Sequence, residues 1–112
     1  MEAGQLVVVG CTAPREKFWG VLLDLAPVGA TLRGLPLPTF EDYLVQVAHG
    51  REQLLGTVTI FIPMHRVERI ELDESSGAVE GLGERFRRTT GKDPRVQLLG
   101  GVEGAPATVD VR

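Results

Sequence analysis

The chain has 112 residues, of which 43% are hydrophobic and 24% charged, and its formal net charge is −3. This length allows one domain with a single compact core, and the composition is that of a folded protein and not of a disordered one. The negative net charge argues against a protein that coats nucleic acid over its whole surface, but it leaves room for a local basic patch.

Three strands are predicted in the first third of the chain, at residues 5–12, 17–27 and 28–37. They are rich in Val and Leu and are separated by tight turns that contain proline or glycine. A helix is an alternative for the second of them. Gly20 in its middle favours a strand, because glycine weakens a helix but permits sharp curvature in a strand. The short connections predict an antiparallel meander.

The next segment changes to a helical period. Thr39 is a candidate N-cap and Gly50 a candidate stop, and between them the apolar side chains form one stripe, at Phe40, Tyr43, Leu44, Val47 and Ala48. The sequence therefore predicts a helix at 39–50, inserted between the third and fourth strands. Adjacent Phe18 and Trp19 point to opposite faces of a strand, so one of them needs cover from this helix or from another subunit.

Alternation with a period of two returns after residue 56. Two strands are predicted, at 57–62 and 67–73, and they are joined by a bend at 63–66 because Pro63 cannot donate to a ladder. A short C-terminal helix is predicted at 82–91. The domain thus extends over residues 1–99, and residues 100–112, rich in glycine, alanine and proline, are expected to form a mobile tail.

These elements predict a mainly β fold, a five-stranded SH3-like small barrel with two short helices. Residues 17–35 (KFWGVLLDLAPVGATLRGL) resemble the first sequence signature of the Sm-like family, and residues 59–72 (TIFIPMHRVERIEL) resemble the second. Within the latter, MHRVERI is similar to the Lys-His-Ala-Ile-x-x-Val stretch of the bacterial Sm-like RNA chaperone. The inserted helix departs from the family pattern, as does Met64, which stands where the chaperone has a cation.

The resemblance implies an oligomer that binds RNA or a nucleotide at the barrel rim, with His65 at the pore-lining position. Assembly through the strands at 57–62 and 67–73 has its own physical reason. The segment TVTIFI would otherwise form an apolar edge with unpaired backbone groups.

The candidate RNA-binding residues are His65, Arg66, Arg15 and Lys17. They form a basic rim if the first turn and the bend at 63–66 lie at the same end of the barrel. The alternative is structural: a histidine bonded to a backbone carbonyl at a strand bend, beside a solvated turn.

A second basic surface is predicted on the C-terminal helix. Arg85, Arg88 and Lys92 fall at i, i+3 and i+7, so they form one stripe that can meet phosphate or an acidic partner. The alternative is that they pair with acids of their own chain, at Glu71, Asp73 and Glu74.

No catalytic motif is present, so we expect a protein that is not an enzyme and uses no cofactor or metal. The single cysteine, Cys11, cannot form an internal disulfide, which fits a reducing cytoplasm. No apolar run approaches the ~20 residues of a membrane span, and the first ten residues lack the basic start of a secretory signal. A protein-interaction or scaffold module without a nucleic-acid role is the alternative function.

Overall fold

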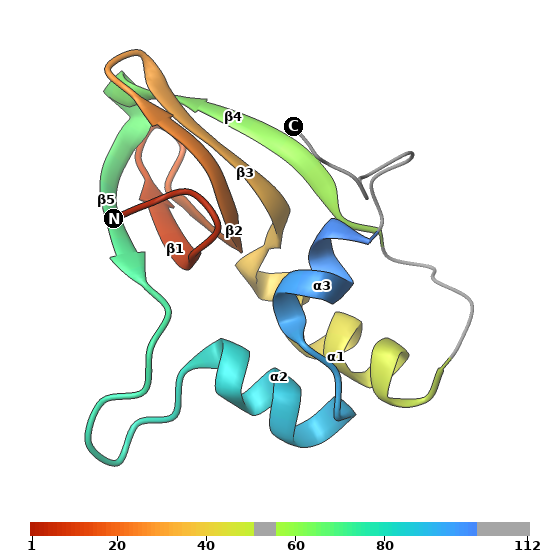
Figure 1. The fold of residues 1–112 in the computed structure, drawn as a ribbon. Helices are drawn as coiled ribbons and strands as arrows, with labels where there is room; N and C mark the ends of the chain where they lie inside the picture. The colour runs from red at the N-terminus through yellow and green to blue at the C-terminus, as the bar shows by residue number, and fades with distance from the viewer. Residues whose placement is uncertain (51–55, 101–112) are drawn as a thin grey trace.

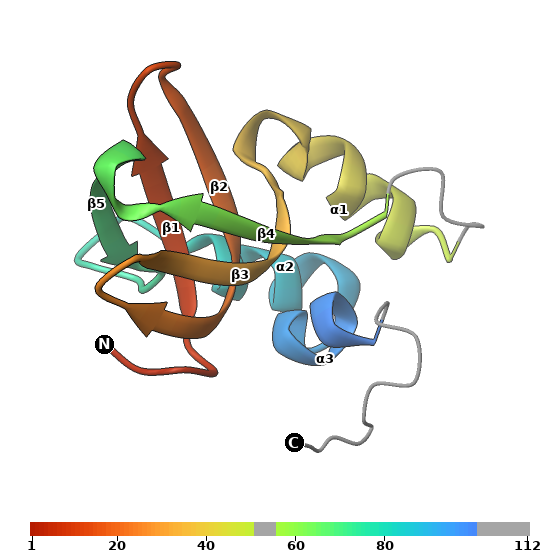
Figure 2. The same cartoon turned by 90° about the horizontal axis from the view of Figure 1, so that it is seen from above.

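The computed structural model of the protein describes residues 1–50 and 56–100. In this part of the chain, five antiparallel strands form one sheet with the order β4-β3-β2-β1-β5, and three α-helices gather at one end of it (Figures 1 and 2). The strands are β1 (Leu6–Cys11), β2 (Glu16–Ala26), β3 (Gly29–Pro36), β4 (Val58–Pro63) and β5 (Val67–Leu72). The predicted mainly β fold and the predicted antiparallel meander of the first three strands are confirmed, and β4 extends this meander beyond β3.

The two predicted helices are also present. A 3₁₀ turn at Leu37–Thr39 leads into α1 (Phe40–Ala48), and α2 (Leu82–Thr90) ends at Gly91, whose φ of 75° is the left-handed conformation expected of a stop. A further helix, α3 (Pro94–Leu99), was not predicted. Its start does carry a local signal, since Asp93 accepts a hydrogen bond from the Arg95 amide and proline follows it. The predicted tail lies outside the described residues, apart from Gly100.

Two apolar cores lie on opposite faces of the sheet. Trp19 and Phe18 are neighbours on β2, and they point one to each core. The first core packs the sheet against the helices and contains Trp19, Val21, Leu35, Phe40, Tyr43, Leu44, Val47, Phe86 and Leu98. The second fills the other face with Val7, Val9, Cys11, Leu22, Ala30, Leu32 and Ile62. Trp19 is fully buried, with its ring edge-on to Phe40 of α1 at 4.9 Å, so the inserted helix supplies the cover that this face needs.

The sheet is strongly curled around a short link between its two edge strands. A 3₁₀ turn, η2 (Met64–Arg66), joins β4 to β5. The Met64 amide donates to the Val28 carbonyl (2.9 Å), at the β2–β3 turn, and the Thr12 amide donates to the Arg66 carbonyl (2.9 Å), at the β1–β2 turn. Both ends of β2 therefore approach a link of three residues, which spans at most about 10 Å. β4 and β5 remain the two edges, so the sheet is not closed.

The bend in β2 depends on two glycines that face each other across the β2–β3 ladder, Gly20 and Gly34. A Cβ added to Gly20 would lie 2.5 Å from the carbonyl oxygen of Arg33, and one added to Gly34 would lie 2.0 Å from that of Trp19. These separations are too short for any side chain, so the two backbones can approach only because both residues are glycine. The ladder shifts register between Leu22 and Asp24, which adds curvature further along β2.

We predict that Gly20→Ala destabilises the fold by roughly 1–3 kcal/mol, because the methyl group overlaps backbone that cannot move without opening the ladder. Urea unfolding followed by the fluorescence of the single tryptophan measures this free energy. Gly10→Ala is the matched control, since Gly10 also lies in a strand but its added Cβ would meet only the Arg69 carbonyl oxygen, at 3.9 Å. Equal stability of the two variants would contradict the proposed constraint.

Candidate functional site

The β1–β2 turn and η2 lie at the same end of the sheet, as the predicted basic rim requires. The side chain of Arg66 ties them together. Its Nε donates to the Thr12 carbonyl (3.1 Å), and its Nη2 donates to the Pro14 carbonyl (2.9 Å) and to the carboxylate of Glu16 (2.8 Å). Only 23% of the Arg66 side chain is exposed. This guanidinium therefore fastens the turn to the link, and a ligand would have to compete with three intramolecular acceptors for it.

The other three predicted rim residues are more open. His65 and Lys17 are exposed, and the Arg15 side chain is 81% exposed, with its guanidinium 4.0 Å from the carboxylate of Glu68. Exposed ion pairs of this length contribute little to stability, so Arg15 stays available to a ligand. Within residues 1–50 and 56–100, His65 forms no hydrogen bond to a backbone carbonyl, unlike His49, whose Nδ1 lies 2.8 Å from the Val45 carbonyl oxygen.

A hollow opens beside these residues, on the surface of β2, β1 and β5. It is lined by Val8, Gly10, Arg15, Lys17, Glu68, Arg69 and Glu71. Gly10 is paired with Lys17 on one side and with Arg69 on the other, and directly opposed residues of antiparallel strands point to the same face. Arg69 was not among the predicted site residues. Its place beside Lys17 depends on the register of three strands, which the sequence alone does not provide.

The basic surface of α2 is neutralised by acids of its own chain, although not by the three acids predicted. Arg85 forms a bidentate pair with Glu41 of α1, with one contact at 2.7 Å, and Arg88 forms one with Glu80 at 2.7 and 2.8 Å. The hydrogen bonds from these arginines lower the pKa of Glu41 and of Glu80. The Lys92 ammonium has no ion pair among the described residues. Lys92 is therefore the most available cation of the predicted stripe.

Asp73, one of the three acids predicted to pair with α2, has a different role. Its carboxylate accepts hydrogen bonds from the Leu82 and Gly83 amides at the start of α2 (both 2.7 Å) and from the indole nitrogen of Trp19 (2.8 Å). Asp73 thus caps the helix from a position nine residues upstream and fixes it to the buried face of the sheet.

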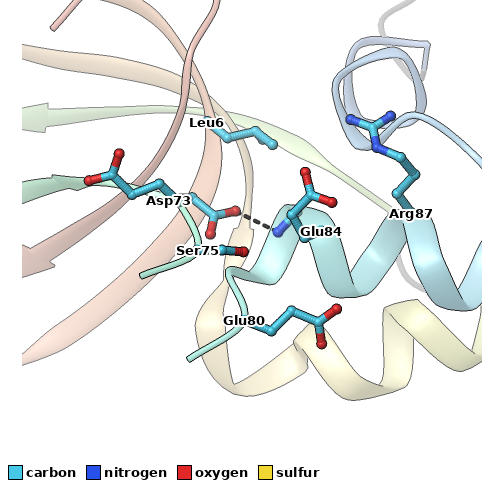
Figure 3. A pocket seen from close by; sticks show the side chains of 8 residues that line it. Leu6, Asp73, Ser75, Glu80, Glu84 and Arg87 are labelled. Carbon is cyan, nitrogen blue, oxygen red and sulfur yellow. Dashed lines mark hydrogen bonds between the residues drawn. The ribbon is translucent and has the colours of Figure 1, made fainter. Parts of the chain in front are cut away.

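The pocket around this cap is acidic. Figure 3 shows Asp73, Glu80 and Glu84 around its mouth with Arg87, and Leu6, Glu74, Ser75 and Gly83 complete the lining. Four carboxylates against one guanidinium disfavour an anionic ligand here. The anion-binding capacity of the α2 N-terminus is already used by Asp73.

Cys11 is buried, and desolvation raises the pKa of its thiol, so it is held in the protonated form that does not act as a nucleophile. Within residues 1–50 and 56–100, no three His, Cys, Asp or Glu side chains gather closely enough to hold a metal ion. None of the helices in this part of the chain is long and apolar enough to cross a membrane.

The free edges of the sheet expose complementary apolar rows. On β4, Ile62 and Ile60 face the second core and Val58 continues their row, 49% exposed. On β5, Val67 and Ile70 pack on the same core, and Leu72 continues that row, 37% exposed. Each edge therefore ends in an apolar row that its own chain covers only in part. An edge strand of this kind favours pairing with another strand.

Comparisons of the chain with protein-family models, with curated proteins and with solved structures gave no match. The resemblance of residues 17–35 and 59–72 to the Sm-like signatures therefore stays a prediction.

Proposed function

We propose that the protein is a non-enzymatic, Sm-like small-barrel module that assembles through β4 and β5 and binds RNA or a nucleotide at the end formed by η2 and the β1–β2 turn. The observation that carries the proposal is the contact of η2 with both turns of the first three strands. It gathers His65, Arg15 and Lys17 at one end of the molecule, next to both unpaired edges.

Assembly into an oligomer is supported by the different side chains of the two edge strands, β4 and β5. β4 presents mainly apolar and hydroxyl side chains, whereas half of the residues of β5 are charged. Pairing β4 of one copy with β5 of the next would bury the row ending at Val58 against the row ending at Leu72 and extend the second core across the interface. Such an interface joins two different surfaces, so it generates a ring if the rotation closes. The Sm-like resemblance implies the same arrangement.

RNA binding is supported by the kind of groups that the rim leaves exposed. Cations bind the phosphate backbone, and an imidazole can stack on an unpaired base or hydrogen-bond to it. In an oligomer, each copy would add one His65 and its neighbouring cations, so weak individual contacts would act together on one strand.

The alternative function, a protein-interaction module, is favoured by a different observation. Arg66, Arg85 and Arg88 all pair with carboxylates of their own chain. Fewer cations are therefore available to bind phosphate than the number of predicted basic site residues. In that case the helical layer, which carries exposed Val45 on α1 and Val96 on α3, is the contact surface.

We predict that the protein is an oligomer at micromolar concentration and that Val58→Lys converts it to a monomer, because a buried ammonium would oppose pairing of the edges. Gel filtration with light scattering measures the mass. Val96→Lys is the control, since Val96 is 67% exposed but lies on α3, away from both edges. A wild-type monomer, an oligomer that survives Val58→Lys, or one that is lost in Val96→Lys as well would contradict this mode of assembly.

We predict that short single-stranded RNA, U-rich or A-rich, binds the wild-type protein at low salt. We expect His65→Ala to weaken binding by roughly 5–150-fold, the loss when a base loses a stacking partner worth about 1–3 kcal/mol. Fluorescence anisotropy across a salt series measures the affinity. The second histidine supplies the control, His49→Ala, because His49 lies at the end of α1. Arg66 is not substituted in this test, because its loss would also loosen the β1–β2 turn. Absence of binding at low salt would favour the protein-interaction alternative.

A further inference from the structure

We propose that the hollow over Gly10 is a phosphate-binding subsite, formed by Lys17 and Arg69 across three strands and completed by Arg15. The inference rests on the proposed RNA-binding function and deepens it. It assigns a phosphate of the RNA backbone to the face of β2, β1 and β5 on which Lys17, Gly10 and Arg69 lie. It also adds Arg69, a residue that is not part of the predicted rim.

The geometry comes from the register of the three strands. Gly10 lies between Lys17 and Arg69 in one cross-strand row, so the Cα atoms of the two cations are about 10 Å apart, two antiparallel spacings. Gly10 is buried but lines the hollow, and a Cβ added to it would meet only the Arg69 carbonyl oxygen, at 3.9 Å, so no side chain fills the middle of the row between the two long flexible cations. An anion seated on Gly10 is therefore within reach of an ammonium from one strand and a guanidinium from another, without a change in the backbone.

Charge distinguishes this hollow from the acidic pocket at the start of α2. Its lining contains three cations, Arg15, Lys17 and Arg69, against two carboxylates, whereas the pocket beside Asp73 contains four carboxylates against one cation. The two carboxylates of the hollow hold two of the cations in the free protein. Glu71 pairs with Arg69 at 2.9 Å and Glu68 lies 4.0 Å from Arg15.

These pairs are weak enough to exchange with phosphate. The side chains of Arg69 and Glu71 are 67% and 51% exposed, and exposed pairs between single charges contribute little because water screens them. A phosphate carries its charge on several oxygens and can accept from Arg69 and Lys17 together, so it competes with one carboxylate for the guanidinium. Lys17 is in no ion pair among the described residues and needs no displacement.

The test measures RNA affinity of the full chain against salt concentration, with fluorescently labelled U10 and A10. We expect Arg69→Ala and Lys17→Ala each to weaken binding and to reduce the slope of log affinity against log salt by about 0.7, the change for one phosphate contact on a single strand. Glu71→Gln should strengthen binding, because it frees Arg69. Arg95→Ala is the matched control, since Arg95 is 54% exposed and lies near an acid of its own chain, Asp93, as Arg69 lies near Glu71. It should change neither quantity.

A titration with inorganic phosphate, followed by the NMR shifts of the Gly10, Lys17 and Arg69 amides, separates failure of the subsite from failure of the function. RNA binding that is unchanged by Arg69→Ala and Lys17→Ala overturns the subsite and leaves the function standing. If the wild-type protein binds no RNA, the proposed function fails, and the phosphate titration then decides the subsite alone. Selective shifts at Gly10 and its two partners would support it, and the absence of such shifts would overturn it.

Discussion

The structure depends on the contact between the link η2 and the two turns of the first three strands. β2 has 11 residues and would extend for about 36 Å if it were straight. The amide of Met64 nevertheless bonds to Val28, in the turn that follows β2, and the carbonyl of Arg66 bonds to Thr12, in the turn that precedes it. The sheet can satisfy both bonds only by curling, and the close approach at Gly20 and Gly34 makes this curl possible. The second core, the position of His65 and the closeness of the two edges all follow from that curvature.

Curvature also explains why the chain needs its helices. A curled sheet of five strands encloses one face and leaves the other convex, and here the convex face carries Trp19 and Leu35. The helices α1, α2 and α3 lie together at one end of the sheet (Figure 1), and they contribute Phe40, Phe86 and Leu98 to the core on this face. Asp73 fixes α2 to it through the indole of Trp19, and Arg33, buried on the same side, donates to the Leu98 carbonyl at the end of α3 (3.4 Å). Burial lowers the pKa of Arg33.

Much of this fold could be predicted from the sequence, because its local signals agree with each other. Segments rich in Val and Leu predict the strands, and the apolar stripe from Phe40 to Val47 predicts α1. Gly20 indicates where β2 bends. The helix α3 was missed because it has only six residues and little periodicity. The partners of the charged residues were the least predictable part. Arg66 meets Glu16 across 50 residues and Arg85 meets Glu41 across 44, and such pairings exist only once the strands and helices have been placed.

The location of the candidate site could therefore be predicted from the sequence, but the contacts of its charged residues could not. The first turn and the link lie against each other, which is the condition that a basic rim requires, but the contact that joins them uses Arg66 itself. The hollow over Gly10 could not have been found by inspecting neighbours in the sequence, since Lys17 and Arg69 lie on two strands, β2 and β5, that flank β1 in the folded sheet.

Native-state hydrogen exchange of the Met64 and Thr12 amides, followed by NMR, tests most directly whether η2 holds the sheet in its curled form. If η2 holds the curled sheet at both of its turns, these two amides exchange as slowly as those at the centre of the β2–β3 ladder, and they become exposed together with them. If they exchange at the rate of an unstructured peptide while the ladder stays protected, the link is not fastened to the sheet, and η2 does not hold the sheet in its curled form.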